Sequence, residues 1–138
     1  MSPLSKSDFE AQAGFRYALR RFLRISEENS RAAGITPQQY QLLLLIKGMK
    51  GRNWATVSEV AEFLQIRHNA AVGLCNRAEQ IGLITRSTHP DDRRQVCVNL
   101  TERGDNIVSI VVLQNRNELR RMWKEMMELF PYGPPSLD

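Results

Sequence analysis

The sequence predicts a mainly α-helical fold with one small β-hairpin. Apolar residues recur at helical spacing over most of the chain, and three threonines stand where helix N-caps are expected. One segment near residue 95 changes instead to the alternation of a strand. The 138 residues, 42% of them hydrophobic, are enough for one domain with a modest core, which we expect to cover residues 1–138.

A long helix is predicted at each end of the chain, over residues 8–31 and 102–130. In the first, Phe15 and Phe22 belong to one apolar stripe, while four arginines lie on other sides of the helix. The second begins after the cap Thr101 and carries apolar residues as far as its end. The apolar faces exceed what a small domain can cover, so we expect these helices to pair with a second copy.

Three shorter helices are predicted between them. The capping pattern Thr36-Pro37-Gln38-Gln39 begins a mostly apolar helix that ends near Met49. Thr56-Val57-Ser58-Glu59 repeats the pattern before a short helix, and the next helix runs from about Asn69 to Ile81. Two short helices joined by a tight turn are typical of a helix-turn-helix, whose second helix lies in a DNA major groove. The buried stripe expected on that second helix consists of Ala71, Leu74, Ala78 and Ile81.

Two short strands follow, at residues 83–88 and 95–100, separated by His89-Pro90-Asp91-Asp92-Arg93-Arg94. Val96 and Val98 alternate with Cys97, which predicts a half-buried strand with the cysteine on the more accessible face. A hairpin with a charged tip after a helix-turn-helix is typical of a wing. Residues 36–101 are therefore expected to form a winged helix-turn-helix region.

These segments resemble the MarR family of bacterial transcription regulators. The pattern Asp92-x-Arg94-x-x-x-Val98-x-Leu100-Thr101-x-x-Gly104 is similar to the family's wing and the start of its next helix. Val60-Ala61-Glu62-x-Leu64-x-Ile66 and Arg77-x-Glu79-x-x-Gly82-Leu83-Ile84-x-Arg86 resemble its helix-turn-helix, in the same order and spacing. The resemblance implies a homodimer of winged helices, joined by the terminal helices and often controlled by a small ligand or by oxidation.

The expected recognition helix differs from the family at its exposed face, where Ser, Thr or Arg is common. Here Ala70, Val72 and Gly73 occupy those places. We expect Val72 to contact a thymine methyl group, Asn69 and Asn76 to read or position bases, and Gly73 to permit close approach to the duplex. Loss of sequence readout is the alternative for this face.

Arginines dominate the remaining candidates for DNA contact. Arg93 and Arg94 at the wing tip suit a narrow minor groove, and Arg94 matches the family's position. We expect Asp92 to accept hydrogen bonds from Arg77 or from its own wing and so to orient the tip. Arg67 and His68 precede the recognition helix, where phosphates meet helix N-termini. Arg86 either reaches a phosphate or ties the hairpin to the helix. The candidates for DNA contact are thus Arg67, His68, Asn69, Val72, Gly73, Asn76, Arg77, Arg86, Arg93 and Arg94.

An effector site is expected from the resemblance, in a cleft between the terminal helices and the winged helix. Its candidate lining residues are Phe15, Phe22, Tyr40 and Trp54, for which an ordinary core position is the alternative. The two cysteines form neither a disulfide framework nor a metal-binding spacing, and Cys75 is expected in the core. No catalytic pattern is present, so neither an enzyme, a cofactor nor a metal is expected.

The charge of +4 and the isoelectric point of 9.4 permit an anionic partner. No apolar run is long enough to cross a bilayer and no secretory signal is present, which favours a cytoplasmic protein without membrane contact. We therefore expect a homodimeric repressor that binds a pseudo-palindromic operator in double-stranded DNA and responds to a small-molecule effector. The alternative is a winged-helix protein-interaction module without sequence-specific DNA binding.

Overall fold

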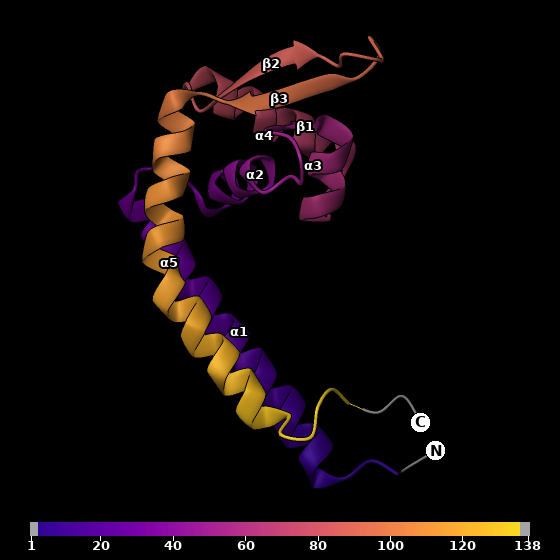
Figure 1. Cartoon of the computed structure of the whole chain (residues 1–138), viewed down its shortest axis with the longest axis vertical. Helices are drawn as coiled ribbons and strands as arrows, with labels where there is room; N and C mark the ends of the chain where they lie inside the picture. Colours follow the sequence, from indigo (N-terminus) through magenta and orange to yellow (C-terminus); the bar gives the residue numbers. More distant parts are fainter. Residues whose placement is uncertain (1–2, 136–138) are drawn as a thin grey trace.

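The computed structural model describes residues 3–135 and confirms the mainly α-helical fold with a small β-hairpin. The expected domain of residues 1–138 extends at both ends into residues that lie outside this range. Within it, five helices and three strands form a lobe with a long arm (Figure 1). None of the helices in the described part is long and apolar enough to span a membrane.

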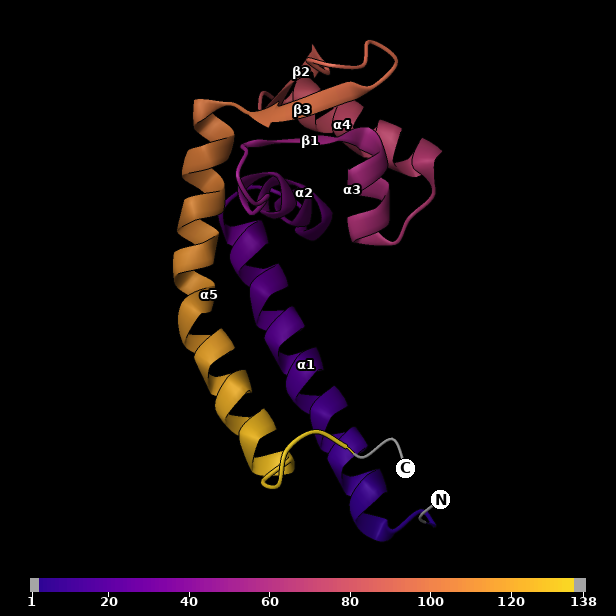
Figure 2. The ribbon, with the colours of Figure 1, turned by 45° about the vertical axis from the view of Figure 1, so that its right-hand side comes forward.

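The arm consists of the two terminal helices, α1 (Lys6–Ala32) and α5 (Glu102–Leu129). They run antiparallel and side by side away from the lobe, as both views show (Figures 1 and 2). Gly14 allows their close approach, because a Cβ atom there would lie 2.6 Å from Leu129 Cδ2. Arg21 of α1 also forms an ion pair with Glu125 of α5. Both helices begin and end within two residues of the bounds predicted for them, 8–31 and 102–130.

Helix α2 (Pro37–Lys47) forms the centre of the lobe. The predicted cap is present: Thr36 Oγ1 accepts a hydrogen bond from Gln39 N at 3.1 Å, and Gln39 Oε1 accepts one from Thr36 N at 3.0 Å. Leu42 and Leu43 are fully buried, as expected for a helix that is apolar on nearly all sides. The other elements of the lobe pack around this helix.

The helix-turn-helix consists of α3 (Val57–Leu64) and α4 (His68–Gln80). Helix α4 begins one residue earlier than predicted, so His68 lies in its first turn. The predicted burial of Ile81 is wrong, since 43% of this residue is exposed. The helix ends at Gln80 and the chain turns at Gly82, which has a φ of +78°, so Ile81 leaves the buried face. Cys75 lies in the core instead, as expected for this residue.

The sheet contains one strand that the sequence did not predict, β1 (Trp54–Thr56). The predicted hairpin consists of β2 (Ile84–Thr88) and β3 (Val96–Leu100), and β3 is the central strand of the order β1-β3-β2. The expected exposure of Cys97 is wrong, since it is buried while Val96 is 42% exposed. The cause is β1, which pairs Thr56 with Cys97 and leaves Val96 beyond the three-stranded part of the sheet.

Gly104 allows the start of α5 to lie directly against the backbone of Leu83, the residue before β2. Substitution of Gly104 tests this contact between α5 and the lobe. A Cβ atom at Gly104 would overlap the backbone carbonyl oxygen of Leu83. We expect Gly104→Ala to lower the free energy of unfolding by about 3 kcal/mol in a urea titration, as overpacking does. Gly73→Ala is the matched control in a helix, because its Cβ would meet only the flexible end of Arg77 at 3.2 Å. The control should change stability by no more than about 1 kcal/mol, in the stabilising direction; equal effects would contradict this packing.

Candidate nucleic-acid interface

Helix α4 presents the predicted recognition face to solvent. Its core face consists of Ala71, Leu74, Cys75 and Ala78, so the residues between them point away from the lobe. Asn69 is exposed, and Val72 and Gly73 are half-buried. The N-cap residue Arg67 makes no side-chain hydrogen bond to the helix, which leaves the first-turn N–H groups without a side-chain partner from the cap. This end of α4 is therefore suited to an anionic group.

A groove of about 210 Å³ joins α4 to the wing. His68 and Val72 line it from α4, and Arg86 and Arg94 line it from the hairpin. The other lining residues are Thr56, Val57, Ser58, Cys75, Gln95 and Val96. The structure thus brings predicted contact residues from two separate segments to one surface.

Arg86 ties the hairpin to α4. Its guanidinium donates a hydrogen bond to Asn76 Oδ1, and its Nε lies 3.2 Å from Glu79 Oε1. We expected Arg86 either to reach a phosphate or to link the hairpin to the helix, and the structure shows the link. Asn76 takes part in the same contact through its carbonyl oxygen, so the contact occupies only part of the hydrogen-bonding capacity of each side chain.

Gly73 is covered by a side chain of its own helix. Its missing Cβ would lie 3.2 Å from Arg77 Nη1, so the guanidinium of Arg77 folds back over this position. The Arg77 guanidinium thus occupies the space beside Gly73 that a side chain at this position would fill.

Asp92 organises the wing tip through contacts within the wing. Its Oδ1 accepts hydrogen bonds from the backbone N of Arg94 at 3.0 Å and from Arg94 Nε at 3.2 Å, and its Oδ2 accepts one from Gln95 Nε2 at 3.3 Å. These bonds, led by the one from the Arg94 backbone, lower the pKa of Asp92. We expected Asp92 to bind either Arg77 or its own wing, and the structure shows contacts within the wing. The Arg94 side chain remains 91% exposed.

Trp54 lies at the base of the wing, in a cluster that no pattern in the sequence predicts. The guanidinium carbon of Arg52 lies 4.3 Å from the centroid of the Trp54 ring, and the His89 ring packs edge-on against it at 5.1 Å. Arg52 Nη1 donates to Glu59 Oε1 at 2.8 Å, and its second Nη donates to the other carboxylate oxygen. The contact with Arg52 is the main cause that lowers the pKa of Glu59 to about 2. Arg52 and Glu59 were missed as site residues, since only the capping role of Glu59 is visible in the sequence.

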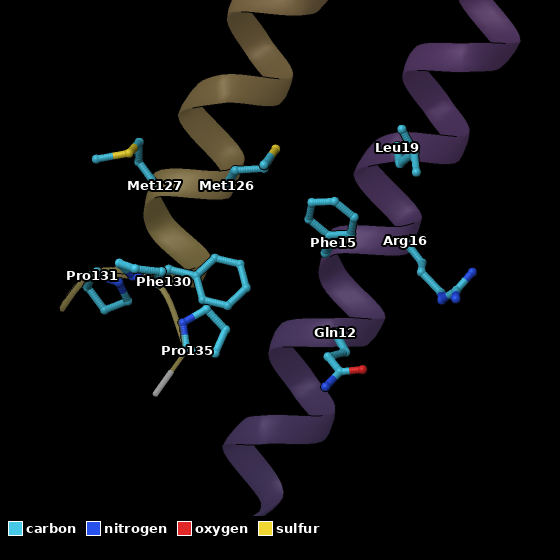
Figure 3. Close-up of a pocket in the computed structure, with 11 residues that line it drawn as sticks. Gln12, Phe15, Arg16, Leu19, Met126, Met127, Phe130, Pro131 and Pro135 are labelled. Carbon is cyan, nitrogen blue, oxygen red and sulfur yellow. The ribbon is translucent and has the colours of Figure 1, made fainter. Parts of the chain in front are cut away.

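The four candidate effector residues do not meet in one cavity. Phe15 lines a cavity of about 830 Å³ between the far ends of α1 and α5, where it faces Met126 and Phe130 (Figure 3). Tyr40 is buried at the junction of arm and lobe, where its hydroxyl accepts a hydrogen bond from Asn115 Nδ2 at 3.3 Å. Phe22 is half-buried on α1, and Trp54 belongs to the wing.

The two cysteines are free and buried. Burial raises the pKa of both thiols, Cys75 and Cys97, which disfavours the reactive thiolate. Among residues 3–135, no three His, Cys, Asp or Glu side chains gather in a group that could hold a metal ion.

Comparison with known proteins finds one family model and curated relatives that match part of this chain. Residues 33–95 match the model of the MarR family. The HTH-type transcriptional repressor MdtR of Bacillus subtilis is 33% identical over 78 residues, which are 56% of this chain and 48% of that protein. The chain spans about half the length of the curated relatives it matches.

Solved structures agree on the fold. AbsC, a MarR family transcriptional regulator of Streptomyces coelicolor, has a TM-score of 0.74 at 20% identity, covering 95% of this chain and 92% of AbsC. A second MarR family regulator of that organism, solved in complex with DNA, has a TM-score of 0.69 at 17% identity, covering 98% of this chain and 81% of the other. At these identities the likeness concerns the fold alone.

The Arg52–Glu59 contact predicts a specific acid response. The pKa of Glu59 in the folded protein is about 2, below its ordinary value of 4.5, so its ionisation stabilises the fold fully above about pH 4.5. This stabilisation is lost as the pH falls from 4.5 through about 2. We expect Glu59→Gln to be less stable than the wild type at pH 6, and the difference to shrink over that range in thermal unfolding. Glu62→Gln, at an exposed carboxylate on the same helix, should track the wild type throughout; a pH-independent deficit of Glu59→Gln would contradict this assignment.

Proposed function

We propose that this chain, whose residues 33–95 match the model of the MarR family, is a DNA-binding transcription regulator of that family. We assign it the role of a homodimeric repressor in the cytoplasm. The observation that carries the proposal is the groove in which His68 and Val72 of α4 face Arg86 and Arg94 of the hairpin. One surface then offers a helix of major-groove size beside a basic wing.

The contacts divide between the two grooves of the duplex. Helix α4 enters the major groove, where Val72 meets a thymine methyl group and Asn69 contacts a base edge. Arg67 and His68, at the start of the helix, bind phosphate. At the wing tip, Arg93 and Arg94 reach the adjacent minor groove, where A·T-rich sequence narrows the groove and deepens its negative potential.

The dimer is proposed from apolar side chains that the arm leaves exposed in a single chain. On α5, Leu113 and Trp123 are 61% and 64% exposed, and on α1 Tyr17 is 64% exposed. A second copy that packs its own arm against this one would cover such residues. The resulting two-fold axis places two α4 helices about one helical turn apart on DNA, which favours a pseudo-palindromic operator.

A regulator that occupies a promoter blocks access to it, so we assign repression rather than activation, and the name of one relative supports this choice. MdtR is described as a transcriptional repressor, and a regulator with a similar fold has been solved with DNA. A small-molecule effector would act by binding one separation of the two lobes more tightly than another. Of the four residues expected to line its site, Phe15 lines a cavity large enough for a drug-sized molecule.

Arg94→Ala tests the wing contact. We expect it to weaken binding to a DNA duplex from the region upstream of the protein's own gene by about tenfold, measured by fluorescence anisotropy. The slope of log binding constant against log salt concentration should fall in magnitude by about one. Arg31→Ala, at an exposed arginine at the end of α1, is the control and should leave both quantities unchanged. If the wild type binds this duplex no better than random DNA and instead captures a defined protein partner, the protein-interaction module is the correct function.

Trp123→Glu tests the dimer. A charge at this exposed apolar position should convert the dimer into a monomer in analytical ultracentrifugation, and should weaken operator binding because the two half-sites are no longer bound together. Phe63→Glu is the matched control, since Phe63 is 59% exposed but lies on α3, away from the arm. A wild-type chain that sediments as a monomer, or an equal effect of both variants, would rule out dimerisation through the arm.

A further inference from the structure

The cluster at the base of the wing has no part in the DNA contacts proposed above. It consists of Glu59, Arg52, Trp54 and His89, in that spatial order. The Arg52 guanidinium makes two kinds of contact at once: its edge donates two hydrogen bonds to Glu59, and its plane lies over the Trp54 ring. Such an arrangement fixes a guanidinium in position and orientation far better than a single ion pair.

One end of the cluster is fixed to the start of the helix-turn-helix. Glu59 Oε1 also accepts a hydrogen bond from Thr56 N at 3.0 Å, and Glu59 N donates to Thr56 Oγ1 at 3.1 Å. Thr56 belongs to β1 and caps α3, and α3 packs directly against α4. The carboxylate that holds Arg52 is therefore held in turn by the element that supports α4.

The other end of the cluster reaches the loop that carries the tip arginines. The His89 ring contacts Trp54, and its Nδ1 accepts a hydrogen bond from the backbone N of Asp91 at 3.0 Å. His89 N also donates to Gln95 O at 3.2 Å, which closes the loop around the tip. Contacts thus run from Glu59 through Arg52 and Trp54 to residues 89–95.

The wing requires such support because the sheet narrows toward its tip. β1 pairs with residues 97–99 of β3, so the hairpin continues past it with two strands only. A two-stranded hairpin is marginally stable in water unless something packs against it. Trp54, the first residue of β1, pairs with Asn99 near the base of the hairpin, and its ring reaches toward the tip to pack against His89, which immediately follows β2.

We propose that Arg52 and Trp54 are positioning residues for the wing, which hold His89 and the tip arginines at a fixed place relative to α4. Their effect on DNA binding rests on the function proposed above. The fixed wing itself is a property of the free protein, and it can be measured without DNA.

Amide hydrogen exchange in the free protein is the first test. We expect Trp54→Leu and Arg52→Gln each to speed exchange at His89, Asp91 and Gln95 by about tenfold, while the amides of α4 keep their rates. Arg21→Gln is the matched control, because Arg21 likewise pairs with a glutamate and lies 5.1 Å from the Tyr17 ring, but in the arm. It should leave wing exchange unchanged. Unchanged wing exchange in both base variants, or an equal rise in α4, would overturn the proposal.

Coupling to Arg94 is the second test. Trp54→Leu and the conservative Arg52→Lys, which keeps the charge but loses the planar fork, should each weaken operator binding by about the factor seen for Arg94→Ala. Trp54→Leu combined with Arg94→Ala should weaken binding by less than the product of the two single effects, since Arg94 is one of the contacts that Trp54 positions. Additive losses would overturn the positioning role. A wild type without sequence preference would refute the proposed function, whereas the exchange result would still decide whether the wing is held.

Discussion

The pairing of β3 with both of its neighbours holds the functional parts of this molecule together. On one side β3 forms the hairpin with β2, and on the other it pairs with β1, which leads directly into α3. At its end the chain turns into α5, where Thr101 N donates to Leu83 O at 3.1 Å. The wing, the helix-turn-helix and the arm are thus joined through one five-residue strand. Because backbone pairing is directional, it fixes their relative orientation as well as their proximity.

A second joint connects the arm to the lobe and is polar although it is buried. Asn115 of α5 donates to Ser26 Oγ at 2.9 Å and to the hydroxyl of Tyr40 at 3.3 Å, and it accepts from Asn29 Nδ2 at 2.8 Å. Three helices therefore meet at one amide. Burial of polar groups is costly unless their bonds are made, so sliding of α1 or α2 against α5 is opposed more strongly than an apolar contact would oppose it. A change in the angle between the arm and the lobe of one chain therefore has to break this joint.

Local signals account for most of what could be predicted from the sequence. The caps at Thr36, Thr56 and Thr101 are contacts within four residues of chain, so the sequence indicates them directly. β1 spans three residues, which is too short to show any periodicity, and its existence depends on β3 more than forty residues away. Because β1 was not predicted, neither the burial of Cys97 nor the cluster around Arg52 could be predicted. The groove was predictable only in part: its residues could be named, but the pairing of Arg86 with α4 depends on tertiary contact.

The hydrogen bond from Arg94 Nε to Asp92 has an entropic consequence. An arginine free in solvent samples many rotamers, and immobilising it on a ligand costs about 1 kcal/mol of side-chain entropy. Here the Nε of the side chain is already held by Asp92, while 91% of the side chain stays exposed. Part of the ordering has then taken place during folding. The acidic residue beside the wing arginine, which repels a polyanion at first sight, thereby lowers the conformational cost of the arginine's encounter with one.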